Sequence, residues 1–146
     1  MSKRVLLVED NGSLSNELER KIEELDYYVE RAYSNVSAFG IWREDGGEYD
    51  CIILDLQINP DGLELEEIEK YAPIFGIAFL HKICEGKTPA EVMAIHKKTI
   101  IYSGFKKELK DLSHKYEWDF GNVKIIEKKG SSIPELIKNV EKICSR

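Results

Sequence analysis

The sequence predicts an α/β fold in which helices cover both faces of an open, parallel sheet. Four short apolar runs, rich in β-branched residues and too short for helices, alternate with longer amphipathic stretches. The runs are continuously apolar, which is typical of strands buried on both faces. The chain has 146 residues, of which 42% are hydrophobic, so we expect one domain with a substantial core.

The apolar runs predict the central strands, and a fifth, more polar segment predicts an edge strand. The runs are residues 5–8, 51–54, 100–102 and 123–126, and the edge strand is expected at 27–32. Helical stretches separate the strands, so the connections are expected to be right-handed crossovers.

Apolar residues at helical spacing predict the helices between these strands. They are expected at about residues 14–25, 36–43, 65–72, 74–83, 90–96, 105–116 and 133–143. Segment 74–83 is apolar nearly all round, which indicates a buried helix. Thr88, Pro89 and Glu91 match a capping box with proline at the first helical position.

Residues 56–75 interrupt this alternation. The segment is acidic, with Asp61 and four glutamates, and Leu65, Ile68 and Ala72 are expected on one side of a short helix. Long connections in a compact domain usually serve a function or contain an element of their own. We expect an insertion between the third strand and the next helix, with its glutamates forming a solvated helix face.

Composition excludes several classes of protein. With 21 basic and 27 acidic residues the formal charge is −6, which argues against broad phosphate neutralisation on DNA, although a local basic patch stays open. No apolar run reaches the roughly 18 residues of a membrane span. Residues 5–8 are too short for a signal peptide, and the three cysteines form no CxxC motif. A cytoplasmic protein with free thiols is expected.

Polar side chains follow the predicted strands. The residues at the strand ends are Glu9 and Asp10, then Asp55, then Ser103 and Gly104, then Glu127, Lys128 and Lys129. In open α/β sheets, ligands bind at the carboxyl ends of the strands. Three carboxylates would therefore meet a hydroxyl and an ammonium group.

This set of groups has a chemical logic. Clustered carboxylates repel one another unless a cation neutralises them, and Mg²⁺ prefers oxygen ligands. A carboxylate beside such a metal can attack a phosphoryl group and form an acyl phosphate. The lysine and the serine would then bind the phosphoryl oxygens.

Four motifs in order resemble the receiver domain of two-component response regulators. They are VLLVEDN at residues 5–11, IILDL at 52–56, IIYSG at 100–104 and IIEK at 125–128. The resemblance covers nearly the whole chain. It implies a flavodoxin-like (CheY-like) three-layer sandwich with a five-stranded parallel sheet of order 2-1-3-4-5. It also implies transfer of a phosphoryl group from a sensor histidine kinase, or a phosphotransfer protein, to an aspartate.

The resemblance implies roles for residues at the first and third strands. Asp55 matches the phosphoacceptor and Asp10 the direct Mg²⁺ ligand. Glu9 matches the acid that holds the metal through water, and the backbone carbonyl of Gln57 matches a further protein contact to the metal.

It also implies roles for residues that follow the last two strands. Ser103 matches the hydroxyl that responds to phosphorylation, and Lys128 the lysine that pairs with the phosphate. Gly104 matches the small residue that leaves room for the phosphoryl group. Gln57 and Phe105 lie where the family tunes the lifetime of the acyl phosphate.

Two departures from the family pattern stand out. Receivers usually carry a proline after the lysine, whereas this chain has Lys129, which makes Lys129 a rival of Lys128. Ile125 stands where the family often has an aromatic switch residue. Tyr102, Trp118 or Phe120 could compensate.

The leading interpretation is a stand-alone receiver, residues 1–146, that acts as a signalling domain and not as a turnover enzyme. Its output would be a phosphorylation-dependent contact with another protein or a homodimer, without direct DNA binding. One alternative is a degenerate receiver that binds partners without phosphorylation. Another is a phosphohydrolase of the haloacid dehalogenase type, but Gln57 stands where that class has its general acid.

Overall fold

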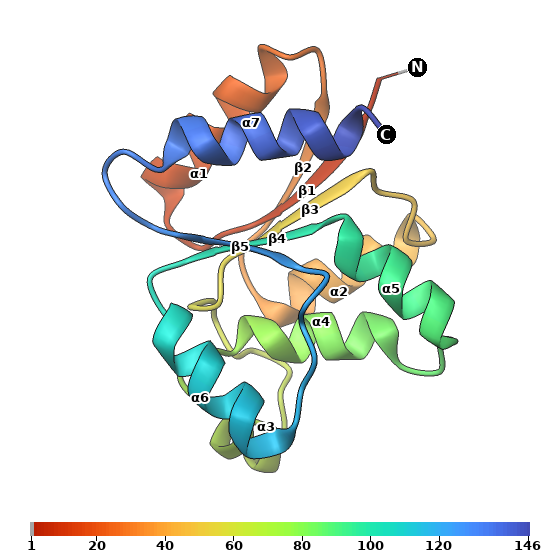
Figure 1. The fold of residues 1–146 in the computed structure, drawn as a ribbon, viewed down its shortest axis with the longest axis vertical. Helices are drawn as coiled ribbons and strands as arrows, with labels where there is room; N and C mark the ends of the chain where they lie inside the picture. Colours follow the sequence, from red (N-terminus) through yellow and green to blue (C-terminus); the bar gives the residue numbers. More distant parts are fainter. Residues whose placement is uncertain (1) are drawn as a thin grey trace.

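The computed structural model describes residues 2–146 and has one five-stranded sheet with the order β2-β1-β3-β4-β5 (Figure 1). The strands are β1 (Arg4–Val8), β2 (Tyr28–Ala32), β3 (Cys51–Leu54), β4 (Thr99–Ser103) and β5 (Lys124–Glu127). All four pairings are parallel. The predicted order and the predicted edge strand are thus confirmed.

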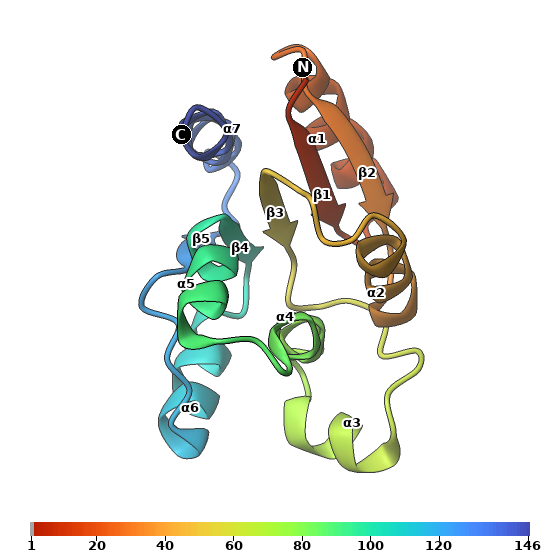
Figure 2. The same ribbon diagram turned by 90° about the vertical axis from the view of Figure 1, so that its right-hand side faces the viewer.

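Helices lie on both sides of the sheet, as the alternating pattern predicted. They are α1 (Gly12–Glu23), α2 (Asn35–Glu44), α3 (Leu65–Tyr71), α4 (Gly76–Cys84), α5 (Pro89–Lys97), α6 (Lys106–Tyr116) and α7 (Ile133–Cys144). Helices α1 and α7 cover one side, and α2 to α6 lie on the other (Figures 1 and 2). No helix within residues 2–146 is long and apolar enough to cross a bilayer.

Alternation along the strands divides the interior into two cores. Leu6 and Val8 of β1 pack with α2 and α4, whereas Val5 and Leu7 pack with α1 and α7. All four side chains are fully buried. Burial on both faces explains why the inner strands are continuously apolar, and it holds their carboxyl ends in fixed positions.

The helix predicted at 65–72 forms as α3, but its expected apolar face is wrong. Leu65 is 69% exposed and Ala72 lies outside the helix, whereas Tyr71 is buried. Tyr71 stacks on Trp118 with ring centroids 5.7 Å apart, and its hydroxyl lies 2.8 Å from His81 Nδ1. The larger aromatic contact therefore decides which side of α3 faces the protein.

Gly76 fixes the start of α4 against the end of β3. Its N–H donates to the Leu56 carbonyl at 2.9 Å. A Cβ at this position would overlap the Asp55 carbonyl oxygen and lie 3.0 Å from the Leu56 Cα. Glycine is therefore required for this close approach, which brings a helix beside the loop that follows Asp55.

Candidate functional site

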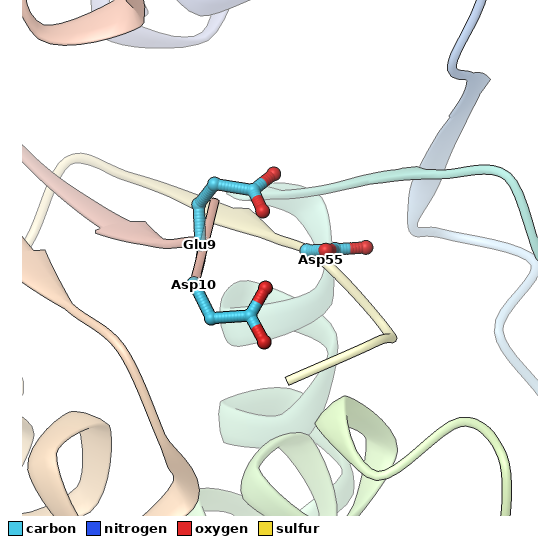
Figure 3. Close-up of side chains that lie close together, drawn as sticks. All are labelled: Glu9, Asp10 and Asp55. Carbon is cyan, nitrogen blue, oxygen red and sulfur yellow. The ribbon is translucent and has the colours of Figure 1, made fainter. Parts of the chain in front are cut away.

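Three carboxylates meet at the carboxyl ends of β1 and β3. Because Val8 pairs in parallel register with Leu54, the residues that follow them emerge at the same edge of the sheet. Glu9, Asp10 and Asp55 each offer an oxygen within 4.8 Å of the others. Figure 3 shows the two side chains after β1 beside Asp55. Glu9 and Asp55 are buried, and Asp10 is exposed.

Lys128, at the end of β5, completes this cluster. Its Nζ lies 2.7 Å from Glu9 Oε1 and 3.1 Å from Asp55 Oδ2. Lys129, by contrast, is 65% exposed, and its Nζ lies 3.9 Å from a Glu127 oxygen. The structure thus places Lys128 beside the acids and directs Lys129 to the surface.

The buried charges shift one another's pKa values. Burial, followed by the charge of Asp55, raises the pKa of Glu9 to about 7, although Lys128 opposes the shift. Burial and Asp55 also raise the pKa of Asp10. Burial lowers the pKa of Lys128, but its hydrogen bond to Glu9 and the charge of Asp55 outweigh this and raise it overall. The cluster holds more negative charge than one ammonium group can balance.

The donor set fits a hard divalent cation. All three candidate ligands are carboxylates, whereas zinc sites normally use histidine or cysteine. Asn11, and not Asp10, caps α1 by accepting the Leu14 N–H at 3.1 Å. Asp10 therefore keeps an exposed carboxylate at the mouth of the cluster. An acidic cluster of this kind, with two buried carboxylates and one exposed one, suits Mg²⁺.

The loop after β3 contributes backbone groups. The Gln57 N–H donates to Asp55 Oδ1 at 3.2 Å, which turns the chain sharply around the aspartate. The Gln57 side chain is exposed. The backbone of Gln57 therefore lies next to the carboxylate cluster, and the role of its carbonyl as a metal contact stays an expectation from the family resemblance.

Ser103, the last residue of β4, and Gly104, which follows it, lie at the same edge of the sheet. The Ser103 hydroxyl accepts the Phe105 N–H at 3.1 Å, and this bond turns the chain into α6. Within residues 2–146 the hydroxyl makes no hydrogen bond to Asp55. The Ser103 carbonyl accepts the Lys128 N–H at 3.0 Å. Gly104 is exposed, and nothing lies within 4 Å of the place where a Cβ would stand.

Sequence reasoning missed an aromatic cluster around His81. This side chain lies 4.8 Å from Trp118 and 5.7 Å from Phe120, measured between ring centroids. Burial and then the charge of Lys70 lower its pKa to about 4. The members of the cluster come from separate elements, so no spacing in the sequence could reveal it.

Solved structures similar to the chain include receiver domains of response regulators. The non-phosphorylated HemR receiver domain from Leptospira biflexa is 23% identical with a TM-score of 0.66, and the match covers 99% of this chain and 96% of that one. The receiver domain of the Francisella response regulator 1452 is 22% identical with a TM-score of 0.65, covering 99% and 98%. A receiver domain protein from Clostridium thermocellum is 18% identical with a TM-score of 0.66, covering 99% and 95%.

No protein-family model matches the sequence, and no curated protein matches it significantly. The structural matches nevertheless span nearly the whole chain. The protein therefore has the receiver-domain fold, the class that the four sequence motifs indicated.

Proposed function

We propose that this protein is a phosphorylation-switched receiver domain in which Asp55 accepts a phosphoryl group with the help of Mg²⁺. The observation that carries the proposal is the meeting of Asp55 with Glu9, Asp10 and Lys128 at one edge of a receiver-type sheet. These residues are far apart in sequence, and each is of the type that phosphoryl transfer to a carboxylate requires.

The acidic and basic residues of the site would have different roles in this reaction. Glu9 and Asp10 would hold the cation with Asp55 and the Gln57 carbonyl, and the cation would neutralise phosphoryl charge. Lys128 would bind a phosphoryl oxygen on the side away from the cation. An Asp55 oxygen would attack phosphorus, the bond from phosphorus to the histidine nitrogen of the donor would break, and that nitrogen would keep the electron pair.

Ser103, Gly104 and Phe105 border the acceptor in this proposal. The Ser103 hydroxyl would move from the Phe105 N–H toward the bound phosphoryl group, and the start of α6 would follow. Gly104 and Phe105 would set access to the phosphoryl group and its lifetime. Such a local electrostatic change can move a surface that another protein reads.

We infer a signalling role and not steady turnover. Gln57 has no carboxyl group that could act as a general acid for repeated ester hydrolysis. The donor would be a sensor histidine kinase or a phosphotransfer protein, and the output a protein contact or a homodimer. Nothing in this role requires contact with DNA or a membrane, and it suits the cytoplasm.

Intact mass after incubation with Mg²⁺ and acetyl phosphate tests the proposal. The wild type is expected to gain one acid-labile phosphoryl group, and Asp55→Asn is expected to gain none because the amide is a poor nucleophile. Asp61→Asn is a matched control, since this exposed aspartate also lies after β3. Equal labelling of wild type and Asp55→Asn would contradict the assignment.

A degenerate receiver that binds its partner without phosphorylation would behave differently. Lys129 and Ile125, which depart from the family pattern, are the observations that favour this second function. Unchanged amide spectra after addition of Mg²⁺ and fluoroberyllate, a phosphoryl mimic, would support it.

A further inference from the structure

Two buried hydroxyl groups hold the turn that carries Lys128. Tyr102 on β4 and Ser132 before α7 are 3% and 6% exposed, and their oxygens lie 2.8 Å apart. Ser132 Oγ also lies 2.9 Å from the backbone nitrogen of Lys129 and 2.7 Å from its carbonyl oxygen. One serine side chain therefore binds both backbone polar groups of the residue after Lys128.

The donors and acceptors in this network can be assigned. A serine hydroxyl has one proton and two lone pairs. The Lys129 carbonyl can only accept, so it takes the serine proton, and the Lys129 N–H donates to the serine oxygen. The Tyr102 hydroxyl must then donate to the remaining lone pair of Ser132. Every bonding position of the serine hydroxyl is filled.

Ser132 stands where a capping residue would normally bind the first N–H groups of a helix. It precedes α7, yet its side chain makes no capping hydrogen bond there. The hydroxyl is thus committed to the Lys129 backbone, which indicates that it stabilises the turn and not the helix.

Tyr102 also supports Lys128 directly. The centroid of its ring lies 5.7 Å from Lys128 Nζ, a distance suited to a cation–π contact. The neighbouring Ser103 carbonyl accepts the Lys128 N–H. The ring therefore lies beside the ammonium group, while the hydroxyl acts through Ser132 on the following residue.

We propose that Tyr102 and Ser132 are positioning residues, which fix the β5–α7 turn so that Lys128, and not Lys129, reaches Asp55. The consequence for phosphoryl transfer rests on the proposed function. The positions of Lys128 and Lys129 do not depend on that function, so the two consequences can be tested separately.

Reductive methylation of the folded protein, resolved by peptide fragmentation, measures the accessibility of each lysine. In the wild type Lys129 is expected to react faster than Lys128, which is 25% exposed and paired with two acids. Tyr102→Phe and Ser132→Ala are each expected to raise the Lys128 rate relative to Lys129 by about fivefold, the effect of one lost hydrogen bond. Ser132→Thr keeps a hydroxyl and is expected to retain the wild-type ratio.

Tyr49→Phe is the matched control. Tyr49 is also buried, and its hydroxyl donates to Asp45 at 2.6 Å, before β3 and away from the carboxylate cluster. This variant is expected to keep the wild-type ratio. An unchanged ratio in Tyr102→Phe and in Ser132→Ala, both folded by circular dichroism, would overturn the proposal.

The initial rate of labelling by acetyl phosphate with Mg²⁺ provides the functional measurement. Tyr102→Phe and Ser132→Ala are expected to slow it by about fivefold, and Tyr49→Phe to leave it unchanged. If the wild type takes up no phosphoryl group while the methylation ratio changes as expected, the proposed function fails and the positioning role stands.

Discussion

At the residue scale, Lys128 compensates two buried acids with one ammonium group. Its Nζ contacts both Glu9 and Asp55, whose side chains are 2% and 5% exposed. Removing one partner of such a cluster leaves uncompensated buried charge, which usually costs more than the intact pair contributes.

Lys128→Met leaves Glu9 and Asp55 without their counter-ion and is expected to lower the free energy of unfolding by about 2 kcal/mol. The loss is smaller than for a fully buried pair, because partial exposure of this position lets water screen the charges. Urea unfolding in Mg²⁺-free buffer measures the loss, and added Mg²⁺ is expected to restore part of it. Lys129→Met is the control and is expected to change the value by less than about 0.5 kcal/mol. Equal effects of the two substitutions would contradict the placement of Lys128.

The raised pKa of Glu9 predicts a specific dependence of the free energy of unfolding on pH. Burial and Asp55 raise its pKa from 4.5 to about 7, so between these values the folded protein binds a proton that the unfolded chain has released. The free energy of unfolding should therefore fall as pH rises from about 4.5 to 7, by at most about 3 kcal/mol, and level off above 7. Urea unfolding without Mg²⁺ across this range measures it.

Glu9→Gln provides the control for this dependence, because its amide does not titrate. The difference in slope between wild type and variant isolates Glu9 from other groups. A wild-type slope equal to that of Glu9→Gln would refute the prediction.

At the scale of elements, the β3–α4 junction and the β4–α6 turn place different demands on glycine. Gly76 lies against the backbone of Asp55 and Leu56, whereas Gly104 faces open space. Gly76 therefore allows α4 to pack closely at the edge of the site. Gly104 leaves open space beside the site.

Gly76→Ala is expected to destabilise the protein by about 3 kcal/mol, because the added Cβ meets backbone that cannot move without displacing the loop after β3. Thermal or urea unfolding measures the loss. Gly104→Ala is the matched control and is expected to leave stability within about 0.5 kcal/mol while slowing phosphoryl labelling of Asp55. Wild-type stability of Gly76→Ala would show that α4 can move away from β3.

At the scale of the whole molecule, the sheet brings together groups from three strand ends, and Lys128 balances only part of their negative charge. Cation binding should therefore be linked to global stability, since a ligand that binds only the folded state shifts the unfolding equilibrium.

Mg²⁺ at about ten times its dissociation constant is expected to raise the free energy of unfolding by about 1.4 kcal/mol. Thermal melts in MgCl₂, compared with NaCl of equal ionic strength, measure the gain. Asp10→Ala is expected to abolish it, and Asp61→Ala to preserve it. A gain of equal size in Asp10→Ala would indicate that Mg²⁺ binds elsewhere.

The strands, most of the helices and the sheet edge where Glu9, Asp10 and Asp55 meet could be predicted from the sequence alone. This prediction was possible because continuous apolar runs define buried strands, and polar residues directly after them must lie at the strand ends. The strand and helix signals are local, so pattern reasoning alone finds these elements. The order of the strands came instead from the resemblance of the four motifs to receiver domains.

The sequence favoured Lys128 over its neighbour Lys129 but left the choice open, because both are basic residues at the same strand end. Their positions became clear in the folded protein, where the β5–α7 turn directs Lys128 toward the acids and Lys129 to the surface. The Tyr102–Ser132 contact and the burial of Tyr71 against Trp118 could likewise not be predicted from the sequence. Such contacts join elements distant in sequence, and their geometry depends on how packed elements meet, which no local pattern contains.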